Sequence, residues 1–232
     1  MLMPTEDVFT LPRPDGDLPV HRFRPDDPAH AGIVLVQEIF GVSPYIRDRA
    51  RDLAEAGYEV HVPELYWRIP DHEVDGSGEQ MLQHGMELMG RTDWDGAVED
   101  TVTAVEHLRG AVEGRVGLVG FCYGGGVAFA AAAQTSVDAL VSYYGSALPG
   151  LLDLAPQVTA PSLHHWGTDD AFIPRETVEE IERAVARDGV EFVWHDGAGH
   201  AFDNPLPAFF HAEASAAAWP RTLTFLGRHL RG

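Results

Sequence analysis

Short runs of β-branched and apolar residues alternate with longer helical patterns along most of this chain, and that alternation is the strongest constraint on its fold. The short runs are typical of buried strands, and most of the longer stretches return apolar residues every three or four positions, as amphipathic helices do. Regular alternation of the two predicts a mainly parallel central sheet with helices on both faces. The predicted strands are residues 33–36, 58–62, 116–119, 139–144, 161–166 and 191–194, and the predicted helices are 45–56, 95–109, 124–134, 175–188 and 211–230.

The length of the chain suits one hydrophobic core. With 232 residues, 45% of them hydrophobic, residues 1–232 are expected to form a single α/β domain without a large cap domain. Near the N-terminus, two short apolar runs flank the turn-forming Pro14-Asp15-Gly16, which predicts an antiparallel hairpin at one edge of the sheet.

The charge balance excludes some classes of partner. The formal net charge is −20, so neither nucleic acid nor an anionic membrane is an expected partner. No apolar run approaches the ~20 residues that cross a bilayer, and Met1-Leu2-Met3-Pro4 has no basic residue before an apolar core, so we expect a soluble, cytoplasmic protein. The single cysteine rules out an intrachain disulfide, which suits a reducing compartment.

The segment Gly120-x-Cys122-x-Gly124 lies between a predicted strand and a predicted helix. This is the pattern of a nucleophile elbow, a sharp turn that exposes a nucleophile at the carboxyl end of a strand, here with cysteine in place of serine. At a helix N-terminus the thiolate form is favoured by the helix dipole. The simpler interpretation is a small buried core cysteine, and the motif alone does not exclude it.

Two further strand ends carry residues that complete such a site. Asp170 follows the predicted strand 161–166, and His200 follows the strand 191–194. In this arrangement His200 would exchange protons with Cys122, while Asp170 would fix the imidazole tautomer and support its charged form. Asp169 is the rival for the acid position, because adjacent side chains point in different directions and only one can reach His200.

The twelve histidines do not indicate a metal centre. Most are scattered singly, and His164 and His165 are neighbours in a predicted strand, so they should face opposite sides of the sheet. No zinc-binding or phosphate-binding sequence motif is present, and we expect neither a metal nor a cofactor.

Several motifs together resemble the dienelactone hydrolase (carboxymethylenebutenolidase) family from about residue 20 to the end of the chain. They are Gln37-Glu38-Ile39-Phe40-Gly41, Leu65-Tyr66-Trp67-Arg68, Gly120-Phe121-Cys122-Tyr123-Gly124-Gly125, Asp170-Ala171-Phe172-Ile173-Pro174 and Gly199-His200-Ala201-Phe202. The resemblance implies an α/β-hydrolase fold and a catalytic triad of Cys122, His200 and Asp170. It also implies cleavage of a small lactone or ester through an acyl intermediate on the thiol.

The same resemblance implies roles for four more residues. Glu38 would be a second carboxylate that contacts the resting thiol, although a structural carboxylate at the start of the next helix is the alternative. The backbone N–H groups of Tyr123 and Ile39 would form the oxyanion hole. Arg68 matches a family arginine that holds a substrate carboxylate, and the alternative for it is a solvated surface arginine.

The chain departs from the family pattern where serine and arginine are expected after the histidine, at Ala201 and Asn204. The departure leaves the substrate open, and a carboxylesterase or thioesterase acting on neutral acyl groups is one alternative. A binding or redox-sensing protein without catalysis is the other. The sequence leaves open whether the protein is a monomer or a small homo-oligomer. Aromatic residues that could line a pocket are Trp67, Trp166, Tyr143 and Tyr144, although aromatic residues near strand ends are more often part of the core.

Overall fold

The computed structural model describes residues 4–74 and 78–231. Residues 1–3, which contribute to the expectation that the chain has no leader, lie outside the described residues, as do residues 75–77 and 232. One sheet of eight strands runs through the described part, with the strand order β1-β2-β4-β3-β5-β6-β7-β8. The strands are β1 (Thr5–Arg13), β2 (Gly16–Arg24), β3 (Ala31–Val36), β4 (Tyr58–Pro63), β5 (Val116–Phe121), β6 (Ala139–Tyr143), β7 (Ser162–Gly167) and β8 (Val190–His195).

The sheet is parallel from β4 to β8 and antiparallel at one edge. There β1 and β2 form the predicted hairpin, with Arg13 paired to Gly16 at its turn, and β2 pairs antiparallel with β4. This arrangement confirms the prediction of a mainly parallel sheet. The strands β3, β5 and β6 are buried along their whole length and consist largely of aliphatic residues, as strands of a parallel sheet covered on both faces do.

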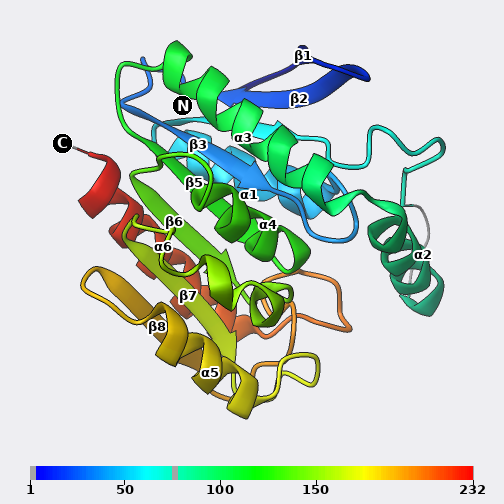
Figure 1. The fold of residues 1–232 in the computed structure, drawn as a ribbon, viewed down its shortest axis with the longest axis vertical. Helices are drawn as coiled ribbons and strands as arrows, with labels where there is room; N and C mark the ends of the chain where they lie inside the picture. The colour runs from blue at the N-terminus through cyan, green and yellow to red at the C-terminus, as the bar shows by residue number, and fades with distance from the viewer. Residues whose placement is uncertain (1–3, 75–77, 232) are drawn as a thin grey trace.

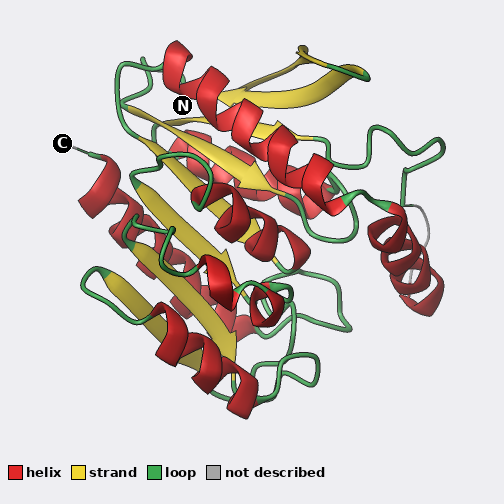
Figure 2. Cartoon of the chain, viewed as in Figure 1, coloured by secondary structure: helices red, strands yellow, loops and turns green. Residues whose placement is uncertain are grey.

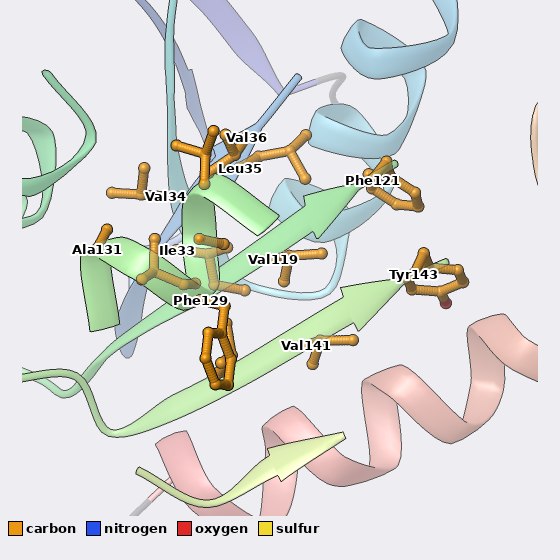
Figure 3. Packing of buried hydrophobic residues seen from close by; sticks show 14 of the residues in the cluster. Ile33, Val34, Leu35, Val36, Val119, Phe121, Phe129, Ala131, Val141 and Tyr143 are labelled. Carbon is orange, nitrogen blue, oxygen red and sulfur yellow. The ribbon is translucent and has the colours of Figure 1, made fainter. Parts of the chain in front are cut away.

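Helices cover both faces of the sheet (Figure 1; Figure 2). The helices α3, α4 and α5 lie in front of it in this view, and α1 and α6 lie behind it. The two layers enclose a core in which aliphatic side chains from β3, β5 and β6 meet Phe129 and Ala131 of α4 (Figure 3). The helices are α1 (Pro44–Glu55), α2 (Gly78–Arg91), α3 (Trp94–Ala111), α4 (Tyr123–Ala132), α5 (Arg175–Val185) and α6 (Ala212–Leu230), with short 3₁₀ turns at Leu148–Gly150 and Leu152–Leu154.

The helix α2 was not predicted from the sequence. It stands apart from the two helical layers, at the right of Figure 1, and of its described residues only Gly85 and Leu88 are buried. Its apolar residues line cavities and do not pack on the sheet, so few of its positions are buried. No helix of the described residues is long and apolar enough to span a membrane.

Candidate active site

The site is built at the carboxyl ends of β5, β7 and β8, where the three predicted loops meet. Cys122 is the residue between β5 and α4, and it has a positive φ of 53° with ψ of −117°. A non-glycine residue rarely adopts such a conformation, and its presence here is the strained turn that an elbow requires.

The two flanking glycines make this turn possible. A Cβ atom at Gly120 would lie 2.1 Å from the carbonyl oxygen of Gly124, and one at Gly124 would lie 2.3 Å from the carbonyl oxygen of Gln37. Backbone hydrogen bonds then hold the turn, because Cys122 donates to the carbonyl of Tyr143 and its own carbonyl accepts from Gly125 and Ser146. The sequence motif is thus explained by two close approaches of backbone to backbone.

The side chains of Cys122, His200 and Asp170 form one continuous chain of contacts. His200 Nε2 lies 3.1 Å from Cys122 Sγ, and His200 Nδ1 lies 2.8 Å from Asp170 Oδ2. The other carboxylate oxygen of Asp170 accepts from the backbone N–H groups of Phe172 and Ile173. The rival Asp169 is exposed and accepts from the hydroxyl of Thr168 instead.

The charge state of His200 follows from this arrangement. Burial alone would lower the pKa of His200, but the negative charge at the Cys122 sulfur and the hydrogen bond to Asp170 outweigh burial and raise the pKa to about 10. An imidazolium 3.1 Å from the sulfur in turn stabilises negative charge on it. His200 is therefore placed to exchange a proton with the sulfur of Cys122.

The backbone N–H groups of Tyr123 and Ile39 are free to bind a ligand. Tyr123 is the first residue of α4, so its N–H has no acceptor within the helix. Within the described residues neither N–H donates a hydrogen bond, and both residues line the same cavity as Cys122. Two such donors beside a nucleophile can stabilise an oxyanion.

Glu38 is buried in the wall of this cavity, with 1% of its surface exposed. Its partner is Asn204, whose amide nitrogen donates to Glu38 Oε1 over 2.8 Å. Burial raises the pKa of Glu38 to about 7, against the opposing effect of the Asn204 hydrogen bond. The expected contact with the resting thiol is not among the hydrogen bonds of the described residues, where the sulfur contacts His200 and the hydroxyl of Ser146.

Arg68 lies outside the cavity that contains Cys122. Its guanidinium bonds the carboxylates of Asp100 and Asp15 and lies over the ring of Trp67, 4.2 Å from the centroid. Asp100 is fully buried, so the pair has a structural explanation, and Arg68 is not among the residues that line the cavity. The structure therefore does not bring Arg68 together with Cys122, contrary to what the resemblance implied.

The aromatic residues Trp67, Trp166, Tyr143 and Tyr144 do not line the cavity, and the core alternative holds for three of them. Tyr143, Tyr144 and Trp166 are fully buried core residues, and Trp67 donates to Asp100. The cavity, of about 470 Å³, is instead lined largely by other apolar side chains. They come from the predicted oxyanion segment, from α2, from the first residue of α3 and from loops: Ile39, Phe40, Leu82, Met86, Met89, Trp94, Ala147, Phe172, Ala201 and Phe209.

Comparison with known proteins identifies the family of the chain. The model of the dienelactone hydrolase family matches residues 18–230. The chain belongs to the dienelactone hydrolase family. It is 33% identical over 198 residues to carboxymethylenebutenolidase 1 of Cupriavidus pinatubonensis, covering 84% of each chain. It is 35% identical over 198 residues to the carboxymethylenebutenolidase of Pseudomonas putida, again covering 84% of each chain.

The fold agrees as well. The crystal structure of a candidate dienelactone hydrolase from Klebsiella pneumoniae superposes with a TM-score of 0.84 at 28% identity, covering 98% of this chain and 100% of that one. Membership of the dienelactone hydrolase family confirms the predicted α/β-hydrolase fold and identifies the chain as a carboxylic ester hydrolase.

Proposed function

We propose that this protein hydrolyses small neutral esters or lactones through a thiol-acyl intermediate on Cys122. The observation that carries the proposal is the line of contacts from sulfur to imidazole to carboxylate, at 3.1 Å and 2.8 Å, beside two free backbone N–H groups. These are the groups that acyl transfer needs: a nucleophile, a proton carrier, its orienting acid and an oxyanion hole.

The reaction proceeds in two steps. The Cys122 thiolate attacks the carbonyl carbon, and the N–H groups of Tyr123 and Ile39 hold the resulting oxyanion. His200 then gives its proton to the leaving alkoxide, the carbon–oxygen bond breaks, and a thioester remains. Water attacks this thioester, His200 takes the proton from the water, and the acid leaves as the thiolate is restored.

The composition of the cavity favours a neutral substrate over a carboxylated one. Among the described lining residues there is no arginine, and His200 is the only side chain that can carry positive charge. Arg68, the implied carboxylate ligand, is engaged by Asp15 and Asp100. A carboxylate on the substrate would have only His200 to balance it and would enter beside Glu38, so it would be poorly stabilised in this apolar site.

The proposal is tested with purified protein on short neutral esters, uncharged lactones and their carboxylated analogues. Cys122→Ala should lose turnover by several orders of magnitude, and His200→Ala should accumulate an acyl adduct on Cys122 that intact-protein mass spectrometry detects. Full turnover in Cys122→Ala would remove the nucleophile from the mechanism. A carboxylated lactone preferred over its uncharged analogue would overturn the substrate class but leave the chemistry intact.

An alkylation experiment on the purified protein distinguishes a catalytic thiol from a redox-sensing one. In a hydrolase, an ester that forms the thioester should protect Cys122 from alkylation by iodoacetamide. A sensor cysteine would react at the same rate with and without ester. The contact of the sulfur with His200 and the two free N–H groups support the catalytic alternative.

A further inference from the structure

A second apolar cavity, of about 430 Å³, lies beside the first. It is formed between the first turns of α2 and the loop that follows Asn204. Phe40, Leu82 and Phe209 line both cavities, so these three side chains form the wall between them. The remaining lining residues of the second cavity are Gly78, Glu79, Met81, Leu206, Pro207 and Ala208.

The wall between the two cavities consists of apolar side chains that are held in place by packing. The rings of Phe40 and Phe209 lie 6.2 Å apart between centroids, and Phe209 and Leu82 are both partly exposed. Partly exposed side chains change rotamer rapidly, so movement of Phe209 or Leu82 can join the two cavities without a change in the backbone. The space beyond the wall is then continuous with the space around Cys122.

The chemistry of the second cavity selects its ligand. Its described lining residues include one charged side chain, Glu79, and otherwise offer almost entirely hydrocarbon surface. A sugar or a phosphate would find few hydrogen-bond donors there, whereas a hydrocarbon chain gains from leaving water. The apolar surface also extends outward at the mouth of the first cavity, where Phe172 is 61% exposed and Met86 is 44% exposed.

We propose that the second cavity binds the distal part of an unbranched hydrocarbon chain carried by the ester. This inference rests on the hydrolysis proposed above and adds a substrate class to it: esters with a medium or long linear chain. The near part of the chain lies in the first cavity, passes Phe209 and ends between α2 and residues 206–209. The chain can belong to the acid or to the alcohol, and two substrate series distinguish these cases.

The first series varies the acyl chain of 4-nitrophenyl esters from acetate to laurate, and the second varies the alcohol of linear alkyl acetates. All substrates are kept below their micelle concentrations. Each methylene that enters apolar space should raise kcat/KM roughly fourfold, and the rise should continue until both cavities are filled. The series in which kcat/KM rises identifies the side of the ester that carries the chain.

Two variants test the cavity itself. Ala208→Trp adds bulk to a residue that lines only the second cavity, and it should lower the ratio of kcat/KM for the long ester to that for the acetate about tenfold or more. Phe209→Ala removes part of the wall and should raise the same ratio. Ala217→Trp is the matched control, because Ala217 is an exposed alanine on α6 that lines neither cavity, and its ratio should equal that of the unmodified protein.

The outcomes separate the two proposals. If the protein turns over acetate but Ala208→Trp and Phe209→Ala both leave the chain-length ratio unchanged, the second cavity is not a binding site and the proposed hydrolysis still holds. If the unmodified protein turns over no ester of either series and no uncharged lactone, both proposals are overturned. Opposite shifts of the ratio in the two variants support the subsite even if one variant is less stable than the parent.

Discussion

The side chain of Asn204 donates to the buried carboxyl group of Glu38 over 2.8 Å, and this bond holds the only carboxyl group among the described residues that line the cavity. An amide is neutral, so it holds Glu38 without supplying the positive charge that would keep it ionised. Burial therefore dominates, and the pKa of Glu38 rises to about 7. The departure at Asn204 noted in the sequence thus changes the electrostatics of the site.

The raised pKa of Glu38 predicts a change of activity near neutral pH. Glu38 is neutral below about pH 7 and charged above it, and a charged carboxylate opposes the oxyanion that forms in the same cavity. We expect kcat/KM for a neutral ester to fall as pH rises through about 7. Glu38→Gln keeps an acceptor for Asn204, and in this variant that step in the pH profile should be absent.

The stability of the protein should also depend on the protonation of Glu38. The pKa of Glu38 is about 7 in the folded protein and 4.5 in the reference state, so the folded state binds more protons between these values. Its contribution to stability is fully present below about pH 4.5 and is lost as pH rises through 7, on the order of 3 kcal/mol in total. Urea unfolding at pH 8 should show Glu38→Gln to be more stable than the parent, and equal or lower stability would contradict the burial cost assigned to Glu38.

Three buried histidines should lower the stability of the protein as pH falls, which is the opposite of the effect of Glu38. Burial lowers the pKa of His164 to about 3 and that of His195 to about 4, and it lowers the pKa of His165 well below its usual value. A lowered pKa means that the unfolded state binds the proton first, so stability is lost as pH falls below about 6.5. Each histidine contributes up to about 1.4 kcal/mol per pH unit.

His164→Phe provides the check on this acid sensitivity. The side chain packs among Phe129, Trp166 and Phe192, and an aromatic replacement preserves that packing. Urea unfolding between pH 7 and pH 5 should show a smaller loss of stability in the variant than in the parent. His229→Phe is the comparison, because burial also lowers the pKa of this partly exposed histidine on α6, so its replacement should reduce the loss of stability by a smaller amount than His164→Phe does.

The sequence predicted the parts of the site that depend on strand ends and close backbone packing. Cys122, Asp170 and His200 follow strands that their own apolar residues identify, and Gly120 is required by a contact with Gly124 in the same turn. The parallel sheet then brings the three loops together, because all three strands end at the same edge. These features are local, and local patterns are what a sequence shows most directly.

The contacts of Arg68 and the lining of the cavity could not be predicted in this way. Arg68 reaches Asp100, which is 32 residues away in the chain, and a motif carries no information on that contact. The helix α2 is a different case, because Leu82, Met86 and Met89 recur at helical spacing, so the sequence did carry a signal for this helix. The buried Asp203, which follows the predicted active-site histidine, gave no such signal, because its partners lie on α1 and α6.

Removing the charge of Asp203 should destabilise the protein strongly. This carboxylate is 1% exposed and accepts hydrogen bonds from Arg49, Tyr45 and the hydroxyl of Ser215. Asp203→Asn leaves the guanidinium of Arg49 without its buried partner, and breaking such a pair typically costs about 3–5 kcal/mol. Asp52→Asn removes the other, half-exposed carboxylate that Arg49 contacts, and a surface pair of that kind contributes about 1 kcal/mol or less. Urea unfolding of both variants at pH 7 measures the difference.

Arg68→Ala should separate a structural arginine from a substrate-binding one. Because Arg68 is engaged by Asp15 and the buried Asp100 and does not line the cavity, we expect its removal to change kcat/KM by less than about threefold for carboxylated and neutral substrates alike. Stability should fall, since Asp100 then keeps only Arg13 and Trp67 as partners. The measurement is a paired comparison of one carboxylated lactone and its uncharged analogue. A loss of tenfold or more confined to the carboxylated lactone would show that Arg68 reaches the substrate after all, and the cavity would then have to rearrange around an anion.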